Sequence, residues 1–254
     1  MEIMPVWAEE FAVRFGAIDG SDLVTLDAIL CFFQEAAISH AENLGVGREA
    51  LSDAGQVWIL SRMSVQVDRR PGYGETVIVR TWPRGGEKIF ALRDFDIRDR
   101  QNNTAVRARS CWLIIDMEKR LPIRPRAIVE KLPLNEGMDA LSGAAGLKEC
   151  LFLRKTAEHR ASYTDVDYNG HVNNVSYIRW IEDALDSALL EKAARMRLDI
   201  NYMNEILPGE TTGIWSARIE APGESVSDAF SFEGKKLHDN HTAFRAELRL
   251  WDSN

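Results

Sequence analysis

The chain has 254 residues, of which 45% are hydrophobic and 28% are charged, and its formal net charge is −8. This composition is typical of a soluble globular protein with material for one large domain or two small ones. The acidic balance argues against a nucleic-acid partner. No apolar run approaches the roughly 20 residues of a membrane helix, so no membrane partner is expected.

The cysteines and the first residues of the sequence indicate the cellular compartment in which the protein is expected. Cys31, Cys111 and Cys150 are widely spaced and form no CxxC pair, which is typical of free thiols in a reducing compartment. The first ten residues contain acids and no basic segment, so a signal peptide is not expected. We therefore expect a cytoplasmic protein, and no motif predicts a cofactor or metal site.

The first long helix is predicted over residues 25–45, with Thr25 as its N-cap and Gly45 as its stop. Its apolar stripe contains His40, which we interpret as a packed core histidine. Alternating segments after the helix predict strands, and residues 89–97 and 105–115 predict a hairpin joined at 101–103. Prolines and a Gly/Ala-rich stretch then predict a connection between two halves of the chain.

A second long helix is predicted after Asn173 or Asn174, either of which could be the N-cap. Its expected buried face consists of Ile178, Ile181, Leu185, Ala188 and Leu189.

The two halves of the sequence resemble each other in three pairs of segments, in the same order. Residues 14–36 match 162–184, residues 62–76 match 195–211, and residues 102–108 match 240–246. Three ordered matches predict duplication of one supersecondary unit.

The most informative motif is the run Asp167-Tyr-Asn169-Gly-His171, which directly precedes the second helix. In an extended segment, alternation would point these three polar side chains to the same side. The helix start could add an anion-binding site through its main-chain amides near residues 172–174. The alternative is a simple turn or helix cap. The first half has Asp19, Ser21 and Leu23 at the matching positions, so one active site per chain is expected.

This order of parts resembles the acyl-ACP thioesterases of plants and bacteria. The likeness includes the motif, the following Tyr177-Ile-Arg-Trp180, residues 58–63 and 67–75, and the segments around Trp82 and Trp112. The resemblance implies an α+β fold, a double (tandem) hotdog in which each long helix is wrapped by an antiparallel β-sheet. It implies an N-terminal hotdog over 1–135 that forms the acyl pocket, a linker over 136–149, and a catalytic C-terminal hotdog over 150–254.

The resemblance also implies the catalytic residues. The family's Asp-x-Asn-x-His falls on Asp167, Asn169 and His171, and its acid within a Tyr-x-x-Glu-like segment falls on Glu205. Many relatives have a cysteine after that acid, but here the residue is Ile206. We therefore expect an activated water rather than a thiolate as nucleophile, with either His171 or Glu205 as general base.

The implied activity is hydrolysis of fatty acyl-ACP to free fatty acid, with acyl carrier protein as partner. An acyl-CoA thioesterase and a non-catalytic acyl-binding hotdog are the alternatives, and a dehydratase is not favoured.

We expect Phe32, Phe33, Trp58 and Met63 to line the substrate pocket. Candidate docking cations are Arg62, Arg69, Arg70, Arg195 and Arg197. The tandem repeat allows either a monomer or a homodimer. His238 and His241 have a metal-like spacing, but we interpret them as part of a solvated hairpin.

Overall fold

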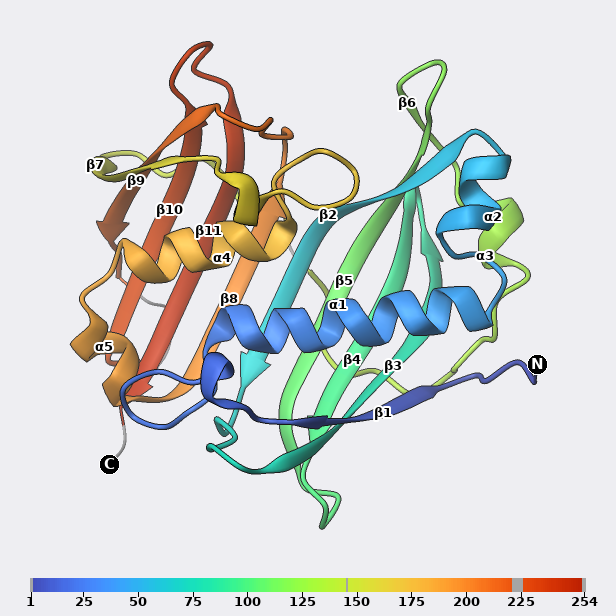
Figure 1. Ribbon diagram of the computed structural model, residues 1–254, viewed down its shortest axis with the longest axis horizontal. Helices are drawn as coiled ribbons and strands as arrows, with labels where there is room; N and C mark the ends of the chain where they lie inside the picture. Colours follow the sequence, from blue (N-terminus) through green and yellow to red (C-terminus); the bar gives the residue numbers. More distant parts are fainter. Residues whose placement is uncertain (1, 145, 221–225, 253–254) are drawn as a thin grey trace.

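The computed structural model describes residues 2–144, 146–220 and 226–252. In these residues, eleven strands form one sheet, with the order β1-β3-β4-β5-β2-β8-β11-β10-β9-β7 and with β6 paired to β5. Neighbouring strands are antiparallel, and the long helices lie across one face of the sheet (Figure 1). This arrangement confirms the predicted α+β class and the tandem hotdog.

The first half begins with a strand and a long helix, followed by the remaining strands of its sheet. Its elements are β1 (Trp7–Ala12), η1 (Phe15–Ala17), α1 (Leu26–Asn43), α2 (Arg48–Asp53), β2 (Gln56–Val67), β3 (Thr76–Glu87), β4 (Phe90–Arg98), β5 (Thr104–Asp116), β6 (Leu121–Ile123) and α3 (Arg126–Val129). The predicted hairpin is confirmed by β4 and β5.

The second half repeats this order with a shorter main helix. Its elements are β7 (Arg154–Arg160), η2 (Tyr163–Asp165), α4 (Asn174–Asp183), α5 (Ser187–Lys192), β8 (Ala193–Tyr202), β9 (Thr211–Arg218), β10 (Asp228–Lys236) and β11 (Thr242–Asp252).

Helix α1 has the predicted start and end. The Thr25 side chain accepts a hydrogen bond from the Ala28 N–H at 3.4 Å, as an N-cap does. Gly45 follows the helix with φ of +67°, a conformation that glycine adopts without a Cβ penalty. The predicted apolar stripe, including His40, is buried against the sheet.

The second helix is shorter than predicted. Helix α4 ends at Asp183, and the Asp186 side chain then accepts the Ala188 N–H at 3.0 Å and caps the separate helix α5. Ile178 and Ile181 are fully buried as predicted, whereas Ala188 is exposed. The prediction of one continuous helix was wrong because a new N-cap starts a second helix. Leu185 and Leu189, which were predicted on the buried face, still pack against the large core cluster.

The core lies between the sheet and both long helices. One large apolar cluster joins the two halves, and a smaller one around Val46, Leu51 and Ile114 lies beneath α2 and the end of α1. No helix in the described ranges is both long enough and apolar enough to cross a membrane.

The predicted duplication is visible in the centre of the sheet. Strands β2 and β8 pair antiparallel, and Val65 pairs with Leu198, its counterpart in the sequence repeat. A pseudo-twofold axis therefore passes through this pair. The turn residues Asn102 and Asn240, matched in the repeat, both have positive φ, at +68° and +59°.

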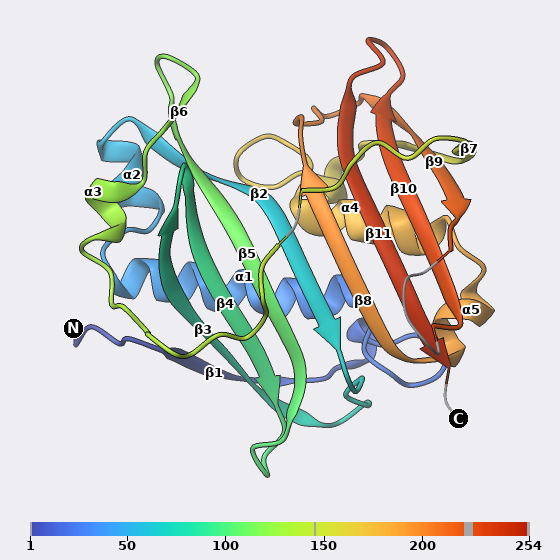
Figure 2. The same ribbon diagram turned by 180° about the vertical axis from the view of Figure 1, so that it is seen from behind.

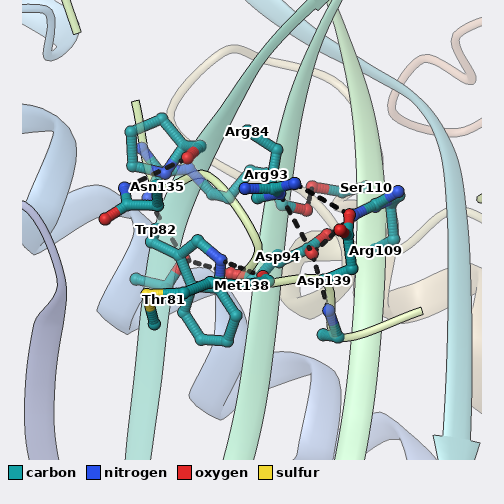
Figure 3. Close-up of polar contacts among 12 residues, drawn as sticks. Thr81, Trp82, Arg84, Arg93, Asp94, Arg109, Ser110, Asn135, Met138 and Asp139 are labelled. Carbon is teal, nitrogen blue, oxygen red and sulfur yellow. Dashed lines mark hydrogen bonds and ion pairs between the residues drawn. The ribbon is translucent and has the colours of Figure 1, made fainter. Parts of the chain in front are cut away.

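The connection between the halves crosses the outer face of the sheet, opposite the helices (Figure 2). Met138 accepts a hydrogen bond from the Trp82 indole at 2.8 Å, and the Asp139 carboxylate accepts one from Arg109 at 2.8 Å. Figure 3 shows Arg109 also contacting Asp94, which accepts the Ala140 N–H at 2.9 Å. This segment is held against the strands, and the boundaries at 135 and 150 stay a prediction because one sheet runs through both halves.

Candidate active site

The motif 165–174 forms a compact loop between β7 and α4 rather than an extended segment. The Asp167 N–H donates to the His171 carbonyl at 3.0 Å, and the Gly170 N–H donates to the Asp167 carbonyl at 3.0 Å. Gly170 has φ of +79°, which favours glycine at this turn. The expectation that strand alternation aligns the three polar side chains was wrong, because the backbone closes a turn through them.

His171 and Glu205 lie together, although 34 residues separate them in the chain. The imidazole Nε2 is 3.1 Å from Glu205 Oε2, and the two side chains are 34% and 52% exposed. Glu205 comes from the irregular segment after β8, and His171 comes from the loop before α4. An imidazole and a carboxylate in this contact, open to solvent, can hold a water and accept its proton.

Asp167 and Asn169 differ in the hydrogen bonds that their side chains make. One Asp167 carboxylate oxygen accepts the Asn169 main-chain N–H at 2.8 Å, which fixes the turn. In the described residues, the Asn169 side chain makes no hydrogen bond and is exposed. Neither side chain hydrogen-bonds to His171 within those residues, so the assignment of Asp167 and Asn169 as catalytic residues stays a prediction.

Most main-chain amides at the start of α4 already have acceptors. The Val172 N–H donates to the Ile206 carbonyl at 2.9 Å, and the Asn173 N–H donates to the Asp165 carbonyl at 2.8 Å. The Asn173 side chain accepts the Val175 N–H at 2.9 Å, so Asn173 is the N-cap. Among the described residues, the N–H of Asn174, the first residue of α4, has no acceptor, as expected in a first helical turn. Of the amides expected to bind an oxyanion, Asn174 is the one left available.

Cys31 and Cys111 offer no nucleophile comparable to this pair. Ile206, at the position of the relatives' cysteine, is fully buried. Burial raises the pKa of the Cys111 thiol above the ordinary value. Partial desolvation and the Asp27 charge also raise the pKa of the Cys31 thiol, although Cys31 is exposed. Both thiols are therefore protonated and weakly nucleophilic.

The four predicted pocket residues occupy two apolar clusters. Phe33 and Met63 are buried in the large cluster, and Phe32 packs against it. The centroids of the Phe32 and Phe11 rings are 5.1 Å apart. Trp58 belongs to the smaller cluster, and its indole donates to the Val46 carbonyl at 2.9 Å. Their role as a common pocket stays a prediction.

A buried polar group in the first half was not predicted from the sequence. The Arg93 guanidinium donates to Thr81 Oγ1 at 3.1 Å and lies 3.0 Å from His40 Nδ1. Burial, reinforced by Arg93, lowers the pKa of His40 to about 4, so the imidazole is neutral and Nδ1 can accept. The sequence did contain an indication of this buried group. Arg93 is one charged residue among the alternating, otherwise apolar positions of a predicted strand that face inward.

The comparisons with known proteins cover both halves of the chain. Residues 5–131 match the acyl-ACP thioesterase N-terminal domain, and residues 153–248 match the acyl-ACP thioesterase C-terminal domain. A chloroplastic palmitoyl-acyl carrier protein thioesterase of Gossypium hirsutum is 27% identical over 79% of this chain and 52% of its own length. A chloroplastic oleoyl-acyl carrier protein thioesterase of Arabidopsis thaliana is 23% identical over 96% of this chain and 72% of its own length. The chain thus spans about half the length of the Gossypium relative.

Solved structures show the same fold over nearly the whole chain. An acyl-ACP thioesterase from Bacteroides thetaiotaomicron has a TM-score of 0.81 and 22% identity, covering 96% of this chain and 97% of its own. The 12:0-ACP thioesterase of Umbellularia californica has a TM-score of 0.79 and 20% identity, covering 98% and 94%. With both domain models matched in order, the chain belongs to the acyl-ACP thioesterase family.

Proposed function

We propose that this protein hydrolyses the thioester of fatty acyl-ACP to free fatty acid and ACP. The observation that supports this most directly is the contact between His171 and Glu205, at 3.1 Å, in a chain of this family. The relatives named above are thioesterases of acyl carrier protein substrates.

The reaction begins with a water bound at the His171–Glu205 pair. The pair accepts a proton as the water oxygen attacks the thioester carbonyl carbon. The tetrahedral intermediate then collapses, the carbon–sulfur bond breaks, and the thiolate leaves and takes up a proton. A thiolate is a good leaving group, so this step needs little acid assistance.

The developing oxyanion is stabilised by the Asn174 N–H at the start of α4. That amide is free in the described structure, and the positive end of the helix dipole lies there. A donor of this kind typically contributes ~3–4 kcal/mol to the transition state. The exposed Asn169 side chain can donate a further hydrogen bond to the substrate or the water.

The docking cations expected from the sequence need correction. Arg70 is buried and ion-paired with Asp19, so it cannot contact a carrier. Arg62, Arg195 and Arg197 alternate with the core residues Met63, Met196 and Leu198, which places them on the outer face of the sheet. The active-site loop lies on the helix side (Figure 1), so these arginines are poorly placed for a carrier that delivers its thioester there.

The test is hydrolysis of acyl-ACP and acyl-CoA that carry the same chain, over a range of lengths. We expect higher kcat/KM on acyl-ACP, and a loss of about 100-fold or more in Glu205→Gln, which keeps the size of the side chain but not the charge. A preference for acyl-CoA would favour the alternative thioesterase. Absence of thiol release from every substrate would contradict the proposal.

A further inference from the structure

Glu205 lies in the irregular segment after β8, so its position depends on bonds from neighbouring elements. Lys236 Nζ, at the end of β10, donates to the Glu205 carbonyl at 3.3 Å. The Ile206 carbonyl accepts the Val172 N–H at 2.9 Å. The backbone that presents the Glu205 carboxylate is therefore held from two sides, by β10 and by the loop that carries His171.

Lys236 is itself fixed by an ion pair at the same segment. Its Nζ lies 3.1 Å from Glu210 Oε2, and that oxygen also accepts the Leu207 N–H at 2.8 Å. The Asp239 carboxylate lies 4.0 Å from Nζ. Burial alone would raise the pKa of Glu210, but hydrogen bonds from the Leu207 N–H and from Lys236 outweigh it and hold that pKa below its ordinary value. Because Lys236 is 9% exposed, its ammonium group depends on these partners in place of water.

The first half provides an internal comparison, because the same turn occurs there. The sequence repeat places Glu75 at the position of Glu210, and each carboxylate accepts the N–H of the residue three positions earlier. That bond is therefore a feature of the fold in both halves. The cation at Glu75 is Arg69 of the same loop, 2.9 Å away, and this pair is exposed.

The cation on the neighbouring strand is a feature of the second half. The strand registers place Asp99 at the position of Lys236, one residue beyond the last pair of each β-hairpin. The Asp99 carboxylate accepts the Asn103 N–H at 2.8 Å, within its own hairpin. Arg70, at the position of Glu205, anchors its segment through its own buried guanidinium. The Glu205 side chain is 52% exposed and offers no such anchor, so its segment depends on Lys236.

We infer that Lys236 is a positioning residue for the His171–Glu205 pair, an inference that rests on the proposed function. Lys236 donates to the carbonyl of the residue that carries the carboxylate, and its charge keeps Glu210 Oε2 at the Leu207 N–H. Without the ammonium group, the Glu205 carbonyl loses this donor and the Glu210 carboxylate loses this ion pair. The Glu205 carboxylate then moves relative to the imidazole, which belongs to a different segment.

The experiment compares two pairs of variants. Lys236→Met removes the ammonium group, and Lys235→Met removes the neighbouring one, whose partner Glu233 lies 3.1 Å away on the same strand. Glu210→Gln loosens Lys236, and Glu75→Gln changes the matching acid of the first half. We expect kcat to fall about 10-fold to 100-fold in Lys236→Met and at least about threefold in Glu210→Gln, with KM changed less than about twofold, since small displacements of catalytic groups have effects of this size. Both control variants should keep kcat within about twofold of the parent. Equal kcat in Lys236→Met and Lys235→Met would overturn the inference.

A substrate-free measurement separates this inference from the proposed function. The imidazole ¹⁵N signals of His171, assigned with a His171→Gln variant, report the contact with Glu205. In Lys236→Met and in Glu210→Gln they should shift toward their values in Glu205→Gln, whereas the two control variants should leave them at the parent values. The two substitutions change the local charge in opposite senses, so a common shift reports displacement of the carboxylate rather than a change in the electric field.

The outcomes of this measurement are distinct. Unshifted signals in folded Lys236→Met, or shifts of opposite sense in Lys236→Met and Glu210→Gln, would overturn the positioning role even if the parent hydrolyses acyl-ACP. The common shift in a protein without hydrolytic activity would support the positioning role and contradict only the proposed function. If Lys236→Met does not fold, the comparison of Glu210→Gln with Glu75→Gln decides in the same way.

Discussion

The Arg70 guanidinium lies against the Asp19 carboxylate in the first half, at the positions that Glu205 and Asp167 occupy in the second. Arg70 is 4% exposed and also donates to the Val24 carbonyl at 2.9 Å and, across the two halves, to the Leu190 carbonyl at 3.0 Å. Burial alone would raise the pKa of Asp19, but hydrogen bonds from Arg70 and Ser21 outweigh it and hold that pKa below its ordinary value. In the first half, a structural ion pair therefore occupies the positions that correspond to Glu205 and Asp167 in the second half.

Replacing Arg70 with Met should destabilise the protein by about 3 kcal/mol, because it removes the ion-pair partner of Asp19 and the donor to the Val24 and Leu190 carbonyls. The measurement is urea denaturation at pH 7. Arg69→Met is the matched control, since the Arg69–Glu75 pair is 43% and 37% exposed and should contribute less than about 1 kcal/mol. Equal losses in the two variants would contradict the structural role of Arg70.

Asp167 should act mainly through its acceptor oxygen. Asp167→Asn retains an oxygen for the Asn169 N–H, whereas Asp167→Ala removes it and loosens the turn that presents His171. We expect kcat/KM of the Asn variant to exceed that of the Ala variant by about tenfold. If both variants lose activity equally, the negative charge of Asp167 matters more than the turn.

His40 should make the fold less stable in acid. Burial and the nearby Arg93 lower the pKa of His40 to about 4 in the folded state, while the unfolded chain titrates near 6.5. Between these values the unfolded state binds more protons, so stability falls as the pH drops from about 6.5 toward 4. The loss by pH 5 should be about 1–2 kcal/mol, from the linkage of 1.36 kcal/mol per pKa unit.

The check is urea denaturation at pH 7 and pH 5. His40→Gln keeps an acceptor for Arg93 and should reduce the difference between the two pH values. His241→Gln is the control, because that side chain is 70% exposed. The role of His40 is refuted if its variant keeps the full acid sensitivity.

Glu182 should have the opposite effect to His40 on the pH dependence of stability. Its carboxylate accepts the Leu26 N–H at 2.9 Å and the Asp27 N–H at 3.3 Å, so a residue of α4 caps α1 across the two halves. Burial, with a contribution from the Asp27 charge, raises the pKa of Glu182 to about 8. The folded state therefore binds the extra proton between about 4.5 and 8, and stability falls as the pH rises through this range.

Glu182→Gln should remove this part of the pH dependence, measured by urea denaturation from pH 5 to pH 8.5. The control is Asp183→Asn, an exposed acid at the next position. A slope in Glu182→Gln as steep as that of the parent would show that Glu182 titrates normally in the folded state.

Much of the fold could be predicted because helix ends and turns depend on residues that are close together in the sequence. Thr25 and Gly45 delimit α1, and the repeat matched Asn102 with Asn240 because both turns need a left-handed residue. The break at Asp186 was not predicted, because the apolar spacing continues past the point where the aspartate starts α5.

The site was predicted less completely than the fold. The motif led to His171 and the family resemblance led to Glu205, but the turn through Asp167 and Gly170 could not be read from alternation. The hydrogen bond from the Val172 N–H to the Ile206 carbonyl holds the two site segments together, and it joins residues that are 34 positions apart in the sequence. Contacts of this kind become visible only when the strands and helices are assembled.

The pairing of Val65 with Leu198 has a consequence for how this protein could evolve. In an assembly of two identical subunits, every substitution appears in both copies, so a residue needed at one site cannot be replaced at its twin. Covalent fusion across one continuous sheet removes that constraint. One copy could exchange glutamate for arginine and histidine for leucine while its neighbour kept both.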